Sequence, residues 1–124
     1  MVNFSGTWRM RGELPGQVMV TIEHSEPRLV QRLVRTAADG TEQSLEFTYL
    51  TTGEETHQPY AGGTVRVRAA WRGEELVIES WAEVRGRNLH LRDHWSLSAD
   101  GVTLTMAHPD DDLAGQISVF EKVG

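Results

Sequence analysis

The chain has 124 residues, the usual length of one domain, and it contains no cysteine, which excludes disulfide bonds, thiolate metal sites and cysteine nucleophiles. Its 12 basic and 18 acidic side chains give a net charge of -6, so we expect no nucleic-acid partner, because phosphate groups would be repelled. No apolar stretch approaches the roughly 18 residues that cross a bilayer, and the N-terminal residues lack the pattern of a signal peptide, so we expect a cytoplasmic protein with no membrane partner.

Short segments rich in Val, Thr, Leu, Trp and Tyr follow one another along the chain, separated at intervals of roughly 10 residues by Gly, Asp or Asn. Dipeptides such as Asp39-Gly40 and Asp100-Gly101 accept the positive φ angles of tight hairpin turns. No segment shows a sustained helical period. Strands are expected near Phe4–Arg11, Val18–His24, Leu29–Thr36, Ser44–Thr51, Thr64–Trp71, Glu75–Val84, Leu89–Ser98, Val102–His108 and Gln116–Val123.

This series of strands predicts an all-β fold. Sequential antiparallel strands without covering helices leave two unpaired sheet edges, and closing the sheet on itself removes both. We therefore expect residues 1–124 to form one domain, a single closed antiparallel up-and-down β-barrel of eight to nine strands.

The polarity of alternate residues predicts which side chains point into the barrel, because successive residues on a strand face opposite sides. Val67 and Ala69 share one face of their strand, whereas Arg66 and Arg68 share the other. The same reasoning places charged residues of three neighbouring strands on one surface, where opposite charges can pair. That surface is the expected outer face, and the interior is expected to be apolar with few polar groups.

Both ends of the chain resemble known barrel proteins. Residues 3–10 (Asn-Phe-Ser-Gly-Thr-Trp-Arg-Met) resemble the Gly-x-Trp opening strand of lipocalins and of the intracellular fatty-acid- and retinoid-binding proteins, and residues 117–123 resemble the closing strand of those binding proteins. Small bacterial lipocalin-like domains share the opening run, the Trp71-Arg72-Gly73 turn and the run from Trp95 to Gly101. The resemblance implies a lipocalin-like (calycin) barrel, in which the first and last strands pair and Trp8 plugs the closed end.

Two departures from the fatty-acid-binding group limit what the resemblance implies. That group has a helix-turn-helix lid after its first strand, and here Gly12–Gln17 leaves room only for a turn. It also holds the ligand carboxylate with an Arg-x-Tyr pair, and the matching positions are Ser118 and Phe120, which favours a neutral or differently held ligand. The resemblance turns these two residues inward, whereas the apolar alternation favours Ile117 and Val119, and both orientations stay open.

The function expected first is the binding of a small hydrophobic molecule inside the barrel, since a small closed barrel leaves room for about one such molecule. The longest irregular stretch, Thr52–Gly63, is expected to form a lip or lid from which Tyr60 or His57 reaches the ligand. The candidate pocket residues are Met10, Phe47, Tyr49, Tyr60, Trp71, Leu91, Trp95, Met106 and Phe120.

Asp93 is the most unusual position, because its parity points a carboxylate into an apolar interior, where it has to be paired or protonated. Held near His24, His108 or Tyr49, it would form an acid–base set. The alternative function is therefore a cofactor-independent isomerase, cyclase or hydratase that acts on a natural-product-like substrate, with Asp93, His24 and Tyr49 as catalytic residues. In the plainer interpretation, Asp93 accepts hydrogen bonds from a neighbouring strand or turns outward at a bulge.

Neither a metal nor a cofactor is expected. His90 and His94 lie on a predicted strand, which separates them by roughly 13 Å, too far to share one ion. The run Asp110-Asp111-Asp112 lacks the alternating ligands of a calcium loop. Trp81 falls on the charged face, where it either covers an Arg stem or belongs to a dimer interface, so the protein is expected to be a monomer or a homodimer.

Overall fold

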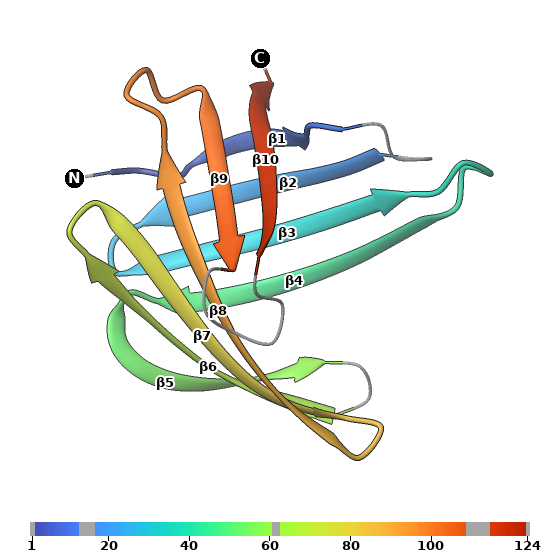
Figure 1. The fold of residues 1–124 in the computed structure, drawn as a ribbon, viewed down its shortest axis with the longest axis vertical. Helices are drawn as coiled ribbons and strands as arrows, with labels where there is room; N and C mark the ends of the chain where they lie inside the picture. The colour runs from blue at the N-terminus through green and yellow to red at the C-terminus, as the bar shows by residue number, and fades with distance from the viewer. Residues whose placement is uncertain (1, 13–16, 61–62, 109–114, 124) are drawn as a thin grey trace.

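The computed structural model describes residues 2–12, 17–60, 63–108 and 115–123. Ten β-strands make up most of these ranges (Figure 1). They are β1 (Gly6–Met10), β2 (Gln17–Ser25), β3 (Arg28–Thr36), β4 (Glu42–Leu50), β5 (Thr52–Tyr60), β6 (Gly63–Arg72), β7 (Glu75–Val84), β8 (Arg87–Leu97), β9 (Thr103–His108) and β10 (Gln116–Val123). No helix in the described ranges is long and apolar enough to cross a membrane.

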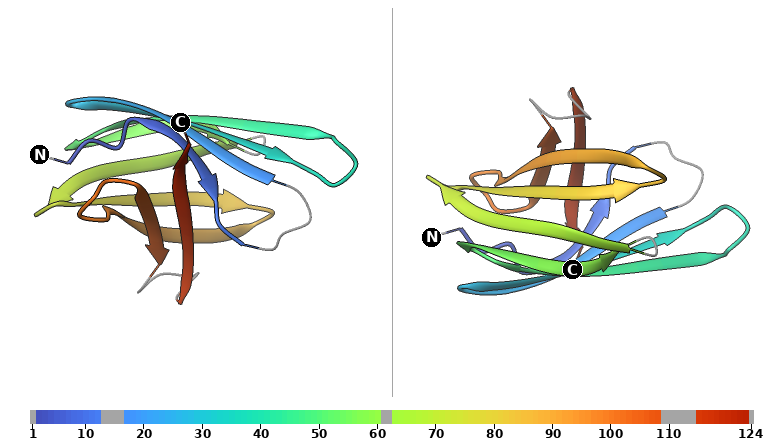
Figure 2. Two further views of the ribbon diagram at one scale, coloured as in Figure 1. Left: turned by 90° about the horizontal axis from the view of Figure 1, so that it is seen from above. Right: turned by 90° about the horizontal axis from the view of Figure 1, so that it is seen from below.

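The strands form one antiparallel sheet in the order β4-β3-β2-β1-β10-β9-β8-β7-β6-β5. Each strand therefore lies beside its neighbours in the chain, except that β1 pairs with β10 and no ladder joins β4 to β5. The sheet curls into a nearly closed barrel (Figure 2), which confirms the expected all-β, up-and-down architecture and the pairing of the first and last strands. The expected number of eight to nine strands is wrong, because the barrel has ten.

The additional strand is β5, which occupies most of the stretch expected to be an irregular lip. Its residues are almost all polar, so no alternation of apolar and polar side chains marks it, and it lies at an end of the sheet order with a strand ladder to β6 alone. A register shift between Thr52 and Glu55 and the positive φ of Gly53 (89°) interrupt its period near the start, and Pro59 lies near its end. Bulges and proline are typical of edge strands, so a search for alternating apolar residues misses this one.

A side chain bridges the gap between the two edge strands. The Thr48 N–H of β4 donates to Gln58 Oε1 of β5 (2.7 Å), and Gln58 Nε2 donates to the Thr48 carbonyl (2.7 Å). The Gln58 amide thus replaces one backbone rung of the missing ladder. The expectation of a fully closed barrel is corrected here, because the described parts of β4 and β5 are joined by a side chain and not by strand pairing.

The hairpin turns expected from the sequence are confirmed. Gly40 and Gly101 have φ angles of 89° and 75°, which a residue with a side chain rarely adopts. The aspartate before each glycine accepts a hydrogen bond from a backbone N–H two residues beyond it, from Thr41 (2.9 Å) and Val102 (3.3 Å). These local bonds fix the turns between β3 and β4 and between β8 and β9.

Burial confirms the predicted inner and outer faces. Val67 and Ala69 are buried, whereas Arg66 and Arg68 are exposed. On β10, Phe120 is 2% exposed and Ile117 is 65% exposed, so the last strand has the orientation that the resemblance implies and not the one that apolar alternation favours. The reason is the register, which pairs Phe120 with inward-facing neighbours on both β1 and β9.

Candidate functional site

One half of the barrel interior is packed and the other is open to solvent. On β3, β4, β7 and β8, the inward-facing residues near one end are fully buried, among them Leu29, Leu76 and Trp95, each 0% exposed. Toward the opposite end of the same strands the inward-facing apolar residues are only half-buried. These residues, Leu33, Phe47, Ala82, Leu89 and Leu91, define the open half. Apolar side chains inside a barrel that keep contact with solvent are typical of a binding site.

Polar side chains lie next to the open half on the same inner face. The Tyr49 hydroxyl donates to Gln31 Oε1 (3.2 Å), and both residues are buried. Asp93 Oδ1 lies 3.0 Å from His108 Nε2, and both of these side chains are partly exposed. We call these four residues the inner polar cluster. The apolar wall and the few polar groups beside it have the composition of a small-molecule site.

The electrostatics of the inner polar cluster depend on Tyr49 and Asp93. Burial raises the pKa of the Tyr49 phenol, and the negative charge of Asp93 raises it further. Tyr49 is therefore a neutral hydroxyl at every physiological pH. Trp95, two residues beyond Asp93 on β8, lies edge-on to Tyr49 with ring centroids 6.0 Å apart, so Asp93 and Tyr49 belong to the same part of the interior.

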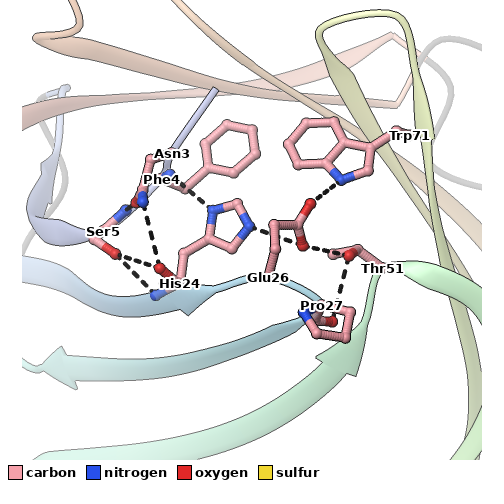
Figure 3. Close-up of polar contacts among 8 residues, drawn as sticks. All are labelled: Asn3, Phe4, Ser5, His24, Glu26, Pro27, Thr51 and Trp71. Carbon is pink, nitrogen blue, oxygen red and sulfur yellow. Dashed lines mark hydrogen bonds and ion pairs between the residues drawn. The ribbon is translucent and has the colours of Figure 1, made fainter. Parts of the chain in front are cut away.

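A second polar cluster closes the packed end of the barrel (Figure 3). The Phe4 N–H donates to His24 Nδ1 (3.1 Å), so the ring hydrogen of neutral His24 is on Nε2, which lies 3.3 Å from Glu26 Oε2. Ser5 Oγ accepts from the His24 N–H (2.9 Å). The segment before β1 is thereby tied to the end of β2. We call the residues drawn in Figure 3 the closed-end cluster.

Glu26 joins three parts of the chain in the closed-end cluster. Its carboxylate accepts hydrogen bonds from the Thr51 hydroxyl and from Trp71 Nε1. Desolvation opposes the ionisation of Glu26, but the hydrogen bonds from Thr51, Trp71 and His24 outweigh it and lower the pKa of the carboxyl below its usual value. The ring of Trp71 stacks on Phe4 with centroids 5.8 Å apart, so Trp71 serves to close the barrel end.

The structure brings together only part of the predicted catalytic set. Tyr49 and Asp93 belong to the inner polar cluster with His108, whereas His24 belongs to the closed-end cluster and has no hydrogen bond or ion pair with either of them in the described residues. Asp93 is paired with the buried Ile78 and lies two residues before the buried Trp95, so it is on the inner face, as its parity predicts. Gln31 was not predicted as a site residue. The alternation of β3 could have identified it, because it places Gln31 between Leu29 and Leu33 on the inner face.

The predicted pocket residues lie in different parts of the structure. Phe47, Tyr49 and Leu91 lie in or beside the open half, and Met10 is half-buried on β1. Trp71 lies in the closed-end cluster, and the side chain of Tyr60 is outside the described residues. Three further residues, Trp95, Met106 and Phe120, are buried in the packed core.

The outer face of β5–β8 has a groove of about 770 Å³. Register aligns His57, Arg66, Trp81 and His90 across the four strands. The Arg66 guanidinium lies over the Trp81 ring, 4.7 Å from its centroid. The His90 ring stacks on the same indole, with the two ring centroids 5.2 Å apart. Trp81 therefore covers an Arg on the charged face, as expected. Arginines of this face are paired with carboxylates, as Arg66 is with Glu55 (3.3 Å) and Arg68 with Glu79 (3.5 Å).

Glu79 is the central anion of this outer face. Desolvation opposes its ionisation, but the hydrogen bond from His90 and the charges of Arg92 and Arg68 lower the pKa of its carboxyl. The described residues include no group of three or more His, Asp or Glu side chains placed to hold a metal ion. The arginines and glutamates of the outer groove compensate one another's charge through these ion pairs.

Comparison with known proteins gives a structural likeness and no family. No family model matches the sequence, and no curated protein matches it. The fold is similar to that in the crystal structure of secretory abundant heat soluble protein 4 from Ramazzottius varieornatus, with a TM-score of 0.71 over 98% of this chain and 95% of that chain. The sequence identity is 13%, so the likeness concerns the barrel fold alone.

Proposed function

We propose that the protein binds one small hydrophobic molecule in the open half of the barrel, in the manner of lipocalin-like carriers. The observation that carries this proposal is that Phe47 and Leu91 face the interior but are only half-buried, so solvent still reaches part of each side chain. Leu91 also lies outside the packed hydrophobic cluster, whereas Phe47 touches its edge.

The physical argument for a ligand is the apolar area that solvent still wets inside the barrel. Each Å² of apolar surface removed from water contributes about 25 cal/mol to binding. Tyr49 of β4 and Trp95 of β8 meet across the interior with ring centroids 6.0 Å apart. Inward-facing side chains of opposite strands therefore border the same interior, so one molecule can contact several of them at once. Such a concave surface offers more contact area per ligand atom than an open face of the sheet.

The proposal predicts a strong effect of a polar substitution in the open half. Leu91→Gln is expected to weaken binding of the neutral fluorophore 1-N-phenylnaphthylamine by about tenfold or more, since it removes an apolar contact worth about 1.5–3 kcal/mol when fully buried. Fluorescence titration measures the dissociation constant. The matched control is Ile117→Gln, which changes an apolar residue that is 65% exposed on the outer side of β10 and is expected to alter binding by less than about twofold.

Two results would contradict the proposed function. The first is a wild-type protein that does not bind the fluorophore saturably. The second is equal loss of binding in Leu91→Gln and Ile117→Gln, since binding would then not depend on the open half.

A further inference from the structure

The charges around the interior restrict the chemistry of the ligand. Of the basic side chains, all except Arg92 are exposed, and Arg92 lies on the outer face within 3.5 Å of Glu79. Beside the open half, the described inner face therefore carries the carboxylate of Asp93 and the imidazole of His108, whereas the imidazole of His24 lies in the closed-end cluster. The described inner face carries no guanidinium or ammonium group.

The inner face carries a hydrogen-bond acceptor, the Asp93 carboxylate, and a hydrogen-bond donor, Trp95 Nε1. The Asp93 carboxylate accepts hydrogen bonds, and its negative charge acts on the buried Tyr49. Trp95 Nε1 is a buried donor with no acceptor among the described residues, and its ring lies edge-on to Tyr49 with centroids 6.0 Å apart. This donor is enclosed in the packed core, and a buried donor without a partner costs about 1–3 kcal/mol.

From this arrangement we infer that the open half selects an apolar ligand whose polar end donates a hydrogen bond, a hydroxyl or a protonated amine, and that it disfavours carboxylates. The inference rests on the proposed function, because it concerns the ligand of the same site. Asp93 is partly exposed, and its two oxygens can accept a hydrogen bond from a ligand as well as from His108, so a donor end is attracted. A carboxylate meets a like charge there, and the described interior offers it no guanidinium or ammonium group.

Three probes with the same alkyl chain test this inference: octan-1-ol, octylamine and octanoate. Each competes with 1-N-phenylnaphthylamine for the wild-type protein at about pH 7.5, where octylamine is a cation and octanoate an anion. The alcohol or the amine is expected to bind at least about tenfold more tightly than octanoate, since a nearby like charge shifts such equilibria by about one pKa unit or more. Which of the two leads shows whether the site prefers a hydroxyl or an ammonium group.

The variant Asp93→Asn keeps the size of the side chain and removes its charge. It is expected to reduce the preference over octanoate to within about threefold, since the like charge that caused it is gone. Asp100→Asn is the matched control, because Asp100 lies exposed in the turn between β8 and β9 and is expected to leave the preference unchanged. The wild-type ranking needs no variant, so the test holds even where Asp93→Asn fails to fold.

The outcomes separate this inference from the function on which it rests. Octanoate that binds as tightly as both other probes, or more tightly, would overturn the inference and leave hydrophobic binding standing. A protein that binds neither the fluorophore nor any of the three probes would overturn the proposed function, and the inference with it.

Discussion

Trp8→Ala is expected to lower the free energy of unfolding by about 3–5 kcal/mol, the usual cost of removing a fully buried tryptophan. Trp8 is 0% exposed, and its Nε1 donates to the Phe4 carbonyl at 3.0 Å, so the substitution both opens a cavity and leaves that carbonyl without its donor. The loss is measured by chemical denaturation followed by far-ultraviolet circular dichroism, because a fluorescence signal would change with the tryptophan itself.

The matched control for Trp8 is Trp81→Ala, which removes the same side chain from the outer face. Trp81 is half-buried between Arg66 and His90, and its loss is expected to cost about 1 kcal/mol. A milder variant, Trp8→Phe, keeps most of the apolar volume and is expected to cost about 1–3 kcal/mol, through the lost hydrogen bond and a smaller cavity. Equal losses for Trp8→Ala and Trp81→Ala would show that the packed end is not held together by Trp8.

Glu26→Gln is expected to destabilise the protein by about 1–3 kcal/mol at neutral pH, because hydrogen bonds to a charged group are stronger than those to an amide. A glutamine can accept with its oxygen, but its NH₂ group faces a second donor, either the Thr51 hydroxyl or Trp71 Nε1. Unfolding by urea at about pH 7 measures the difference from the wild type.

The difference between wild type and Glu26→Gln is expected to depend on pH. The pKa of Glu26 in the folded protein lies below the unfolded value of 4.5, so its contribution to stability is complete above that value and is lost as the pH falls through the folded pKa. The two proteins should therefore converge in strongly acidic solution. Glu46→Gln is the control, because its ion pair with Arg32 is exposed and is expected to contribute less than about 1 kcal/mol. A pH-independent difference would contradict the role assigned to Glu26.

The sequence predicts the barrel well where apolar and polar residues alternate strictly. The faces of β6 follow from Val67 and Arg66, and the turns follow from Asp39-Gly40 and Asp100-Gly101, because these signals are local. The edge strand β5 was missed because its residues are almost all polar, so no alternation of apolar and polar side chains marks it. The bridge from Gln58 to Thr48 has no local signal at all, since it depends on how the two edges approach each other.

The candidate site was predicted in part for the same reason. Parity alone places Asp93 and Tyr49 inside the barrel, and in the structure the negative charge of Asp93 adds to burial in raising the pKa of the Tyr49 phenol. Parity also places His24 and Trp71 inside the barrel. It does not predict that the segment containing Phe4 folds over these two residues, or that both contact Glu26. That contact joins residues far apart in the chain, and only the three-dimensional arrangement reveals it.

The most direct test of the account is a ¹H–¹⁵N correlation spectrum of the labelled protein recorded during a titration with octan-1-ol. The account predicts saturable shifts at the backbone amides of Phe47 and Leu91 and at the indole N–H of Trp95, with little change at Ile117 or at the Trp81 indole on the outer face. No saturable shift anywhere, or shifts confined to the groove around Trp81, would contradict the claim that the open half of the barrel is the binding site.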